Sequence, residues 1–366
     1  MNNETLEYRQ AICTIVVFLI GSSVVLGINT DTEQDSWISF LFSAIETIPL
    51  LLMYSRMTKF YPGKNLYDIS VEILGKIAGT IINVLMIWYA IHLSSIVLRN
   101  FTEFIEIISL QETPKLPLMI AIIVIALYLA KSGPRVLGSW SIIALTVISI
   151  AVFMTIILSV NEMDFSNILP IKEASFKEIL FDSFRSFAFP LNEMVLFLCM
   201  LNNIKMDNRP YKAFLYSLLF GTLILLSIML RNLFILGASN IEALYLPSYS
   251  AARTIRIGDF ISRIEGSVSL NFVFTGLTKM TVCIIAATNG FRKLLNSRNS
   301  KMYVVPVCLL VLAICPYTYL NAIEMFTFID KYEHYAFPFQ VVIPIIIWAG
   351  AEFKNLKQKK TADVKA

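Results

Sequence analysis

Two charged residues lie inside long apolar stretches of the sequence, and both could do chemistry. Glu193 ends the segment FAFPLNE, and Lys279 lies in the middle of GLTKMTVC. A charge in such surroundings is costly unless it has a partner or a function. Glu193 could therefore meet a ligand ammonium or exchange a proton, or it could only stabilise its helix or pair with another segment.

Lys279 needs a partner of opposite charge, because an unpaired ammonium away from water is strongly disfavoured. Two carboxylates lie at a comparable depth, Glu46 in the second apolar run and Glu193 in the sixth. A neutralised ion pair is the structural interpretation of Lys279. We expect its partner to be Glu46 rather than Glu193.

Pro190 predicts a break in the helix that carries Glu193. Its ring clashes with the preceding turn and pushes Phe189 off helical geometry, so a second half-helix is expected to begin at Pro190. The free N–H groups at that point would face a cavity and could bind a carboxylate. The ligand-binding residues expected at this break are Phe187, Ala188, Phe189, Pro190, Asn192 and Glu193.

A second interruption lies in the first apolar run, in IGSSVVLG at 20–27. Gly21, Ser22 and Ser23 are poor helix formers, and we expect them to line the same ligand site. The two interruptions are five runs apart, so the two halves of the chain enter the membrane from opposite sides. Broken helices at matching positions of two halves indicate an inverted-repeat transporter fold with its site at the repeat interface.

The elements that must position these residues are membrane-spanning helices. The chain has 366 residues, of which 57% are hydrophobic and 15% are charged, whereas soluble domains have about 25% charged residues. The apolar runs do not alternate as the strands of a β-barrel would. Ten runs approach or exceed the roughly 20 residues that a spanning helix needs. They are 10–28, 36–57, 78–100, 116–132, 136–160, 185–203, 211–237, 266–290, 302–320 and 335–353.

The distribution of Lys and Arg between the spans predicts the topology. Basic loops alternate with loops that are mostly acidic, and the tail at 354–366 is rich in Lys. Basic loops stay in the cytoplasm, so we expect both termini to be cytoplasmic. We predict one membrane domain over 1–366, with repeat 1 at about 10–160 and repeat 2 at about 185–353.

Three further segments carry expectations about their surroundings. The stretch 62–77 has the apolar spacing of an amphipathic helix on the cytoplasmic surface. The loop 239–265 could cap an extracellular vestibule. Arg231, near the outer end of the seventh span, is expected to extend to the membrane interface.

The sequence carries no pattern typical of an enzyme or a metal protein. It has two His, no phosphate-binding glycine loop and no Cys and His spacing that suits a metal. We therefore expect no catalytic residue, no cofactor and no metal site. The net charge of +4 reflects the basic loops, so lipid rather than nucleic acid is the expected surrounding. All five Cys lie inside the apolar runs and are expected to pack as small apolar side chains.

Several segments resemble the B subunit of the GerA-type spore germinant receptors, which belong to the amino acid–polyamine–organocation superfamily. The resemblance runs from about residue 5 to 355. In relatives the first break often reads like G-A-G, whereas here it reads Gly21-Ser22-Ser23. The segments that carry it are YRQAICTIVVFLIGSSVVLG, DSWISFLF, FYPGKNLYDI, LGKIAGTIINVL, ETP at 112–114, FSNILPI and FAFPLNEMVLFL.

This resemblance implies an all-α integral membrane protein with a LeuT-like 5+5 inverted repeat in which helices 1 and 6 are broken. It also implies residence in the spore inner membrane, assembly with an A subunit and a lipoprotein C subunit, and binding of a nutrient, usually an amino acid. Aromatic residues of the third span commonly wall the site in such proteins, which makes Tyr89 a candidate. Spans one and eight of LeuT-like proteins hold a coupling sodium ion, so Lys279 could alternatively replace that cation.

Three functions remain open at this point. The first is a nutrient-sensing subunit that binds its ligand in mid-membrane and signals to partner subunits. The second is a proton-coupled amino-acid permease that uses the same site. The third is a scaffold that only anchors its partners. All three remain open because fold alone does not choose between functions.

Overall fold

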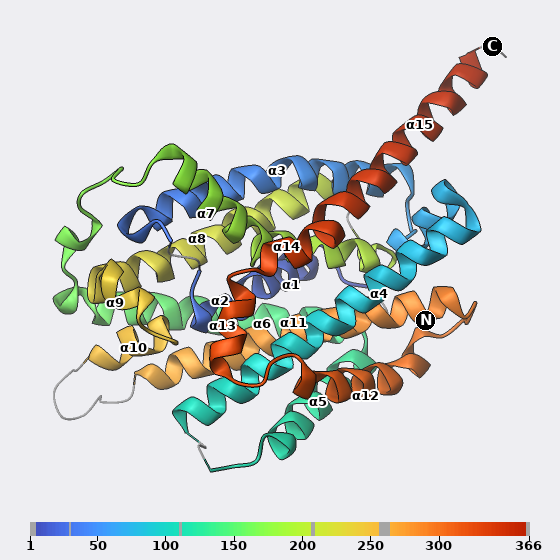
Figure 1. Ribbon diagram of the computed structural model, residues 1–366. Helices are drawn as coiled ribbons and strands as arrows, with labels where there is room; N and C mark the ends of the chain where they lie inside the picture. The colour runs from blue at the N-terminus through green and yellow to red at the C-terminus, as the bar shows by residue number, and fades with distance from the viewer. Residues whose placement is uncertain (1–4, 29–30, 110–111, 206–208, 256–263, 364–366) are drawn as a thin grey trace.

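The computed structural model describes residues 5–28, 31–109, 112–205, 209–255 and 264–363. Within these ranges the regular secondary structure is helical, apart from one isolated bridge between Leu6 and Ile204. The helices run roughly parallel or antiparallel in one bundle (Figure 1). The longer helices are α1 (Tyr8–Ile20), α3 (Ser36–Phe60), α4 (Leu66–Ile108), α5 (Lys115–Ser132), α6 (Pro134–Leu158), α7 (Phe176–Ala188), α8 (Pro210–Leu236), α11 (Glu265–Leu294), α12 (Val304–Ile314) and α15 (Ile343–Asp363). The shorter α-helices are α2 (Ser23–Leu26), α9 (Ala238–Glu242), α10 (Pro247–Thr254), α13 (Ala322–Ile329) and α14 (Tyr332–Phe337).

The predicted spans correspond to these helices. In the described part of the chain, nine helical stretches are long and apolar enough to cross a membrane, and α1 is a shorter apolar helix. The predicted span that is missing from these nine is the first, 10–28. Its helix is too short to be counted because the chain is divided there into α1 and α2. The expectation of ten helices with a broken first and sixth span is confirmed.

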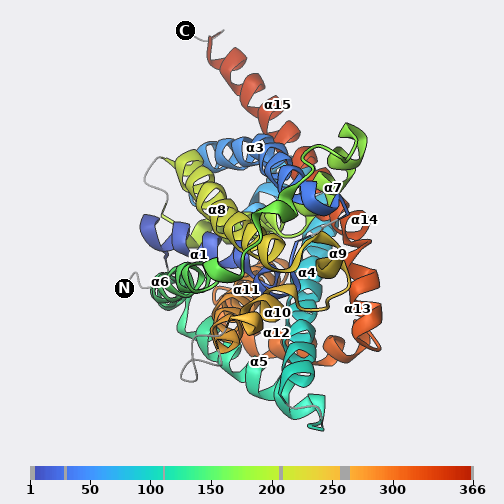
Figure 2. The ribbon, with the colours of Figure 1, turned by 90° about the vertical axis from the view of Figure 1, so that its left-hand side faces the viewer.

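The most buried spanning stretches are Phe176–Asn203, which contains the break at Pro190, and Glu265–Leu294, which contains Lys279. The helix α1 packs against α6, α8 and α11, and α11 also packs along α4. Figure 2, which looks along the bundle, places α11 near its middle. The spans α5, α6 and α12 are much less buried, as expected for helices that face lipid. All five Cys are buried and free, as expected for apolar packing residues.

The sixth span begins earlier than the sequence suggested. Its first half, α7, starts at Phe176, inside what was expected to be a polar loop. The reason is a capping box, in which the Ser175 hydroxyl accepts from the Glu178 amide at 3.3 Å and the Glu178 carboxylate accepts from the Ser175 amide at 2.7 Å. The second half is a 3₁₀ segment, η4 (Leu191–Asn203).

The stretch 62–77 does not lie free on a surface. Its helical part is the beginning of α4, which is separated from the rest by Gly75 at φ 80°. Leu66, Tyr67 and Ile69 are buried, and the Tyr67 hydroxyl donates to the Ala286 carbonyl of α11 at 3.0 Å. The helix is amphipathic as predicted, but its apolar face covers the end of the bundle.

Both ends of the described chain lie at the same end of the bundle, which we call the terminal end. There Lys205 pairs with Glu7, and Lys354 of α15 pairs with Glu72 of the first part of α4. The predicted Lys-rich tail begins as a continuation of α15, which projects beyond the other helices (Figure 1). The opposite end carries α9, α10 and α13. Residues 256–263 of the predicted vestibule loop lie outside the described residues.

Candidate functional site

The first span is interrupted at the residues that the sequence singled out. Gly21 has φ 37°, a conformation that favours glycine, and α2 resumes at Ser23. The Thr275 hydroxyl of α11 donates to the buried Gly21 carbonyl at 2.7 Å. A Cβ at Gly21 would lie 2.7 Å from Cδ of Lys279, so glycine is also needed for the close approach of this side chain.

The sixth span is interrupted at Pro190, as predicted. Phe189 is extended, with φ −133° and ψ 117°, and separates α7 from η4. The interruption frees the Ala188 carbonyl, which accepts from Nε2 of Gln340 at 2.9 Å. Glu193 lies in the first turn of η4 and faces α11.

An ion pair between Lys279 and Glu193 lies where the two interruptions meet. Both side chains are 0% exposed, and Nζ of Lys279 contacts Oε2 of Glu193. The ammonium also lies 5.4 Å from the ring centre of Phe18 and 5.1 Å from that of Phe189. The pair is therefore enclosed by one aromatic ring from the first span and one from the break in the sixth.

The prediction that Glu46 is the partner of Lys279 is wrong. Glu46 is half-buried, accepts from the Ser183 hydroxyl at 3.1 Å, and lines an open groove of about 790 Å³ together with residues of α7. The two carboxylates have similar depth, but α3 turns Glu46 towards α7 whereas η4 turns Glu193 towards α11. The position of a residue within an apolar run predicts its depth in the membrane but not the direction in which its helix turns it.

A directed chain of hydrogen bonds ends on the second oxygen of Glu193. The Tyr332 hydroxyl donates to Oε1 of Glu193 at 2.9 Å and lies 3.0 Å from the Tyr89 hydroxyl. A hydroxyl has one proton, so Tyr89 must donate to Tyr332. Nε2 of Gln340 donates to the Tyr89 hydroxyl at 2.9 Å. The proton donors of the third and last spans are thus all aligned towards the carboxylate, which stabilises its charge.

Asn192 joins this network from the other side. Its Nδ2 donates to the Gln340 carbonyl at 3.2 Å, and its Oδ1 lies 3.4 Å from the Tyr54 hydroxyl, which also lies 3.2 Å from the same carbonyl. Gln340 lies in a π-helical turn, Pro338–Val342. Such turns are frequent at functional sites.

Tyr332 and Gln340 were not predicted from the sequence. Gln340 is a single amide in an otherwise apolar run and follows Pro338, which is a signal that could have been recognised. Tyr332 precedes the predicted start of the tenth span, and no pattern around it indicated its role.

Two cavities meet at Phe189 and Ile329. A small cavity of about 10 Å³ lies beside the ion pair, and a wider one of about 520 Å³ opens on the side of α9 and α13. Phe189 and Ile329 line both cavities. Arg185, in the wall of the wider cavity, pairs with Asp31 and lies 3.6 Å from Glu333. Phe189 and Ile329 therefore separate the ion pair from the wider cavity.

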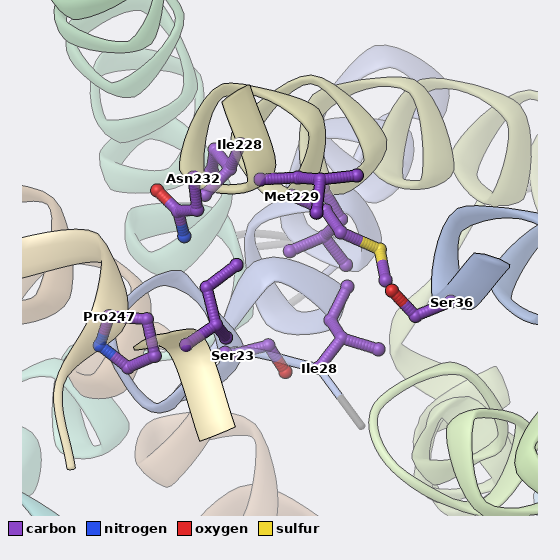
Figure 3. A pocket seen from close by; sticks show the side chains of 11 residues that line it. Ser23, Ile28, Ser36, Ile228, Met229, Asn232 and Pro247 are labelled. Atoms are coloured by element: carbon purple, nitrogen blue, oxygen red, sulfur yellow. The ribbon is translucent and has the colours of Figure 1, made fainter. Parts of the chain in front are cut away.

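The structure places the predicted site residues in different surroundings. Gly21, Ser22, Phe189 and Glu193 lie at the ion pair, and Tyr89 and Asn192 reach it through the network. Ser23 instead lines a separate cavity of about 20 Å³ with Ile28, Asn232 and Pro247 (Figure 3). Ala188 takes part through its carbonyl, and Pro190 forms the break. Phe187 packs against Phe184.

Arg231 also differs from its expectation. It does not extend to an interface but is 3% exposed, and it donates to the Thr155 hydroxyl at 2.9 Å, to Oδ1 of Asn232 at 2.7 Å and to the Ser248 carbonyl at 3.4 Å. Its five N–H donors let neutral oxygens from several helices satisfy it. In the described ranges, no three His, Cys, Asp or Glu side chains are grouped so that they could hold a metal ion.

The arrangement of helices defines a class of protein. The structure is similar to that of MhsT in complex with L-phenylalanine, with a TM-score of 0.69 and 10% identity over 92% of this chain and 87% of that one. A substrate-bound, outward-open Na⁺-coupled sialic acid symporter gives a TM-score of 0.60 and 10% identity over 92% and 79%. The chain is therefore a multi-pass membrane protein with the LeuT-like fold, in which the two broken spans meet at mid-bundle.

The sequence then gives the family. Residues 5–356 match the family model described as spore germination protein, the spore permeases. The chain belongs to this family. It is 22% identical to spore germination protein KB of Bacillus subtilis (strain 168) over 99% of this chain and 98% of that protein, and 22% identical to spore germination protein YndE of the same strain over 96% and 97%. Spore germination protein GerQB of Bacillus cereus is 22% identical over 79% and 78%.

Proposed function

We propose that this chain is the nutrient-sensing B-type subunit of a spore germinant receptor. It binds a small nutrient, an amino acid, at the meeting point of the two broken spans, and binding shifts a conformational equilibrium that partner subunits sense. The A subunit and the lipoprotein C subunit are the proposed partners. The proposed location is the spore inner membrane, with both termini in the cytoplasm.

One observation carries this proposal. The only ion pair among the described residues in which both side chains are 0% exposed, Lys279 with Glu193, lies between the interrupted first and sixth spans. Buried charges at broken helices are typical of ligand sites in membrane proteins of this fold. The site residues that we propose to contact the ligand are Gly21, Ser22, Tyr89, Ala188, Phe189, Asn192 and Glu193. We propose that Ser23, Phe187 and Pro190, which were also expected there, shape the broken spans around the site.

The experiment adds bulk to the site without adding charge. We expect Ala188→Phe to abolish the nutrient response of spores, because Ala188 is 2% exposed and lies at the break beside the network. A matched control is Ala238→Phe at the start of α9, which is half-buried and lies outside both broken spans. Both proteins are measured for abundance in spore membranes and for germination against nutrient concentration. An unchanged response of Ala188→Phe spores with normal protein abundance would contradict the proposed site.

A proton-coupled amino-acid permease is the second candidate, and the likeness to two transporter structures favours it. Sensing requires binding without net transport, whereas a permease moves its substrate. Purified chain in proteoliposomes decides between the two when labelled L-amino acids and a proton gradient are supplied. Robust uphill uptake of an amino acid by the chain alone would contradict the sensor proposal and support the permease.

The position of Lys279 supports a role in place of a sodium ion. It projects from the eighth span against Gly21 of the first, the two spans that hold a coupling cation in LeuT-like proteins. We propose that its ammonium takes the place of that cation. Glu193 then neutralises it in the state described here.

A further inference from the structure

The surroundings of the Lys279 ammonium form a complete receptor for a primary ammonium group. A carboxylate oxygen of Glu193 contacts it, and the rings of Phe18 and Phe189 lie 5.4 and 5.1 Å away. Carboxylates and aromatic faces are the groups that recognise organic ammonium ions. The Tyr332 hydroxyl donates to the other Glu193 oxygen at 2.9 Å and fixes the carboxylate in this position.

This receptor has no room for a ligand while Lys279 occupies it. The adjoining cavity measures about 10 Å³, which is barely enough for one water molecule. Any larger molecule that reaches Glu193 must therefore displace the Lys279 ammonium. The Lys279 stem lies against the unwound segment, since a Cβ at Gly21 would be 2.7 Å from its Cδ.

Three polar atoms beside the ion pair point to a second molecule. The side-chain oxygens of Ser22, Asn100 and Tyr319 line the small cavity, are buried, and have no hydrogen-bond partner in the structure. Buried polar atoms are nearly always paired, so these three atoms are available to bind a polar ligand in the cavity. They come from the first, third and ninth spans and line the same cavity as Glu193 and Lys279.

The charges restrict which ligand can enter. An uncharged molecule leaves the ion pair intact and finds no space. A simple amine replaces Lys279 at Glu193 but leaves the displaced Lys279 without a counterion, and a simple acid leaves Glu193 without one. A zwitterion supplies its ammonium to Glu193 and its carboxylate to Lys279, so that no charge is left unpaired.

We propose that Lys279 is a built-in competitor that occupies the ammonium site at Glu193, and that a zwitterionic ligand activates the protein by exchanging with it. Phe189 takes part in this exchange because it lies over the ammonium and also separates the pair from the cavity of about 520 Å³. A ligand that arrives from that cavity must move Phe189 and Lys279 together. This inference deepens the proposed function, because it rests on ligand binding at this site and names the charges of the ligand.

The test compares amino acids with the amines that remain when the carboxylate is removed. The pairs are L-alanine with ethylamine, L-leucine with 3-methylbutylamine, and L-phenylalanine with 2-phenylethylamine. Binding to the full purified chain in lipid nanodiscs is measured by equilibrium dialysis and by the shift of the thermal unfolding midpoint. In the natural chain we expect at least one amino acid to bind at least tenfold more tightly than its amine.

The variant Lys279→Met removes the competitor and leaves Glu193 free. We expect the amine to bind at least tenfold more tightly than to the natural chain, and the preference for the amino acid to fall at least tenfold. The matched control is Lys293→Met, which removes a lysine of the same helix that pairs with Asp68 outside the site. This control should keep the natural preference.

The outcomes separate the exchange from the proposed function. If the natural chain binds an amino acid but Lys279→Met keeps the natural preference, the exchange is wrong and amino-acid sensing stands. If the natural chain binds none of the three amino acids but Lys279→Met binds the amines, the competitor role stands and the proposed ligand is wrong. Binding by neither protein overturns both. If Lys279→Met cannot be purified, the natural chain decides, because equal affinities for amine and amino acid overturn the exchange.

Discussion

Lys279 and Arg231 are two of the cations that the protein buries in its membrane helices, and they are satisfied in opposite ways. Lys279 of α11 is 0% exposed and contacts a carboxylate. Arg231 of α8 is 3% exposed and, among the described residues, its recorded partners are the neutral oxygens of Thr155, Asn232 and Ser248. A planar guanidinium can be held by several neutral acceptors, whereas a compact ammonium depends on one strong partner.

The difference teaches which of the two charges can be exchanged. Arg231 is held by α6, by its own helix and by α10, so moving it would require several hydrogen bonds to break together. Lys279 is held by one carboxylate and two aromatic rings. The first arrangement is suited to fixing helices to one another, and the second to a switch.

The sharpest way to break this comparison is to remove one charge of the pair at a time. We expect Glu193→Gln and Lys279→Met each to lower the unfolding free energy by about 3–5 kcal/mol, because each leaves the other charge buried and unpaired. The double variant should recover most of this loss. Unfolding in mixed micelles and abundance in membranes are the measurements. If the double variant is as unstable as the less stable of the two single variants, the two charges do not depend mainly on each other.

Arg231 should respond less to the same treatment. We expect Arg231→Met to cost about 1–3 kcal/mol of unfolding free energy, because it leaves buried acceptors unpaired but strands no recorded opposite charge. Arg231→Lys should recover only part of this, since an ammonium cannot reach all three partners. Unfolding under the same conditions as for the pair tests this. A loss as large as that of Lys279→Met would mean that Arg231 neutralises a carboxylate.

Lys293 gives the smallest effect and the baseline. It lies on the same helix as Lys279, and its Nζ is 2.7 Å from Oδ1 of Asp68, with the two side chains 31% and 25% exposed. Such a solvated pair contributes about 0–1 kcal/mol and is screened by salt. We expect Lys293→Met to lose less than about 1 kcal/mol at low salt, and less still at high salt. Unfolding at two salt concentrations measures this, and a salt-independent loss would contradict it.

The parts of the site that depend on local chemistry were predictable from the sequence. Gly21 interrupts its helix because it has no Cβ and can adopt a positive φ, and Pro190 does so because its ring fixes φ and removes the backbone N–H. The partner of Lys279 was not predictable, because the choice between Glu46 and Glu193 depends on how α3 and η4 are rotated about their axes. Tyr332 adds a second reason, since it reaches Glu193 only after the chain has crossed the membrane several more times.

The same applies to the general architecture. The composition and the ten apolar runs were sufficient for the class of fold, because crossing a bilayer restricts the backbone to few solutions. The early start of α7 and the inward packing of the first part of α4 were missed because a capping box and a glycine kink act against the hydrophobic pattern. Arg231 was misplaced because its neutral partners come from three separate helices.

The straight course of α15 has a mechanical consequence. Its 21 residues follow the π-helical turn that holds Gln340 and continue past the end of the other helices (Figure 1). At about 1.5 Å per residue such a rod is roughly 30 Å long, so a tilt of about 5° at its base displaces its tip by roughly 2–3 Å. An adjustment too small to open a cavity at Gln340 is thereby amplified at the terminal end to about the length of a hydrogen bond.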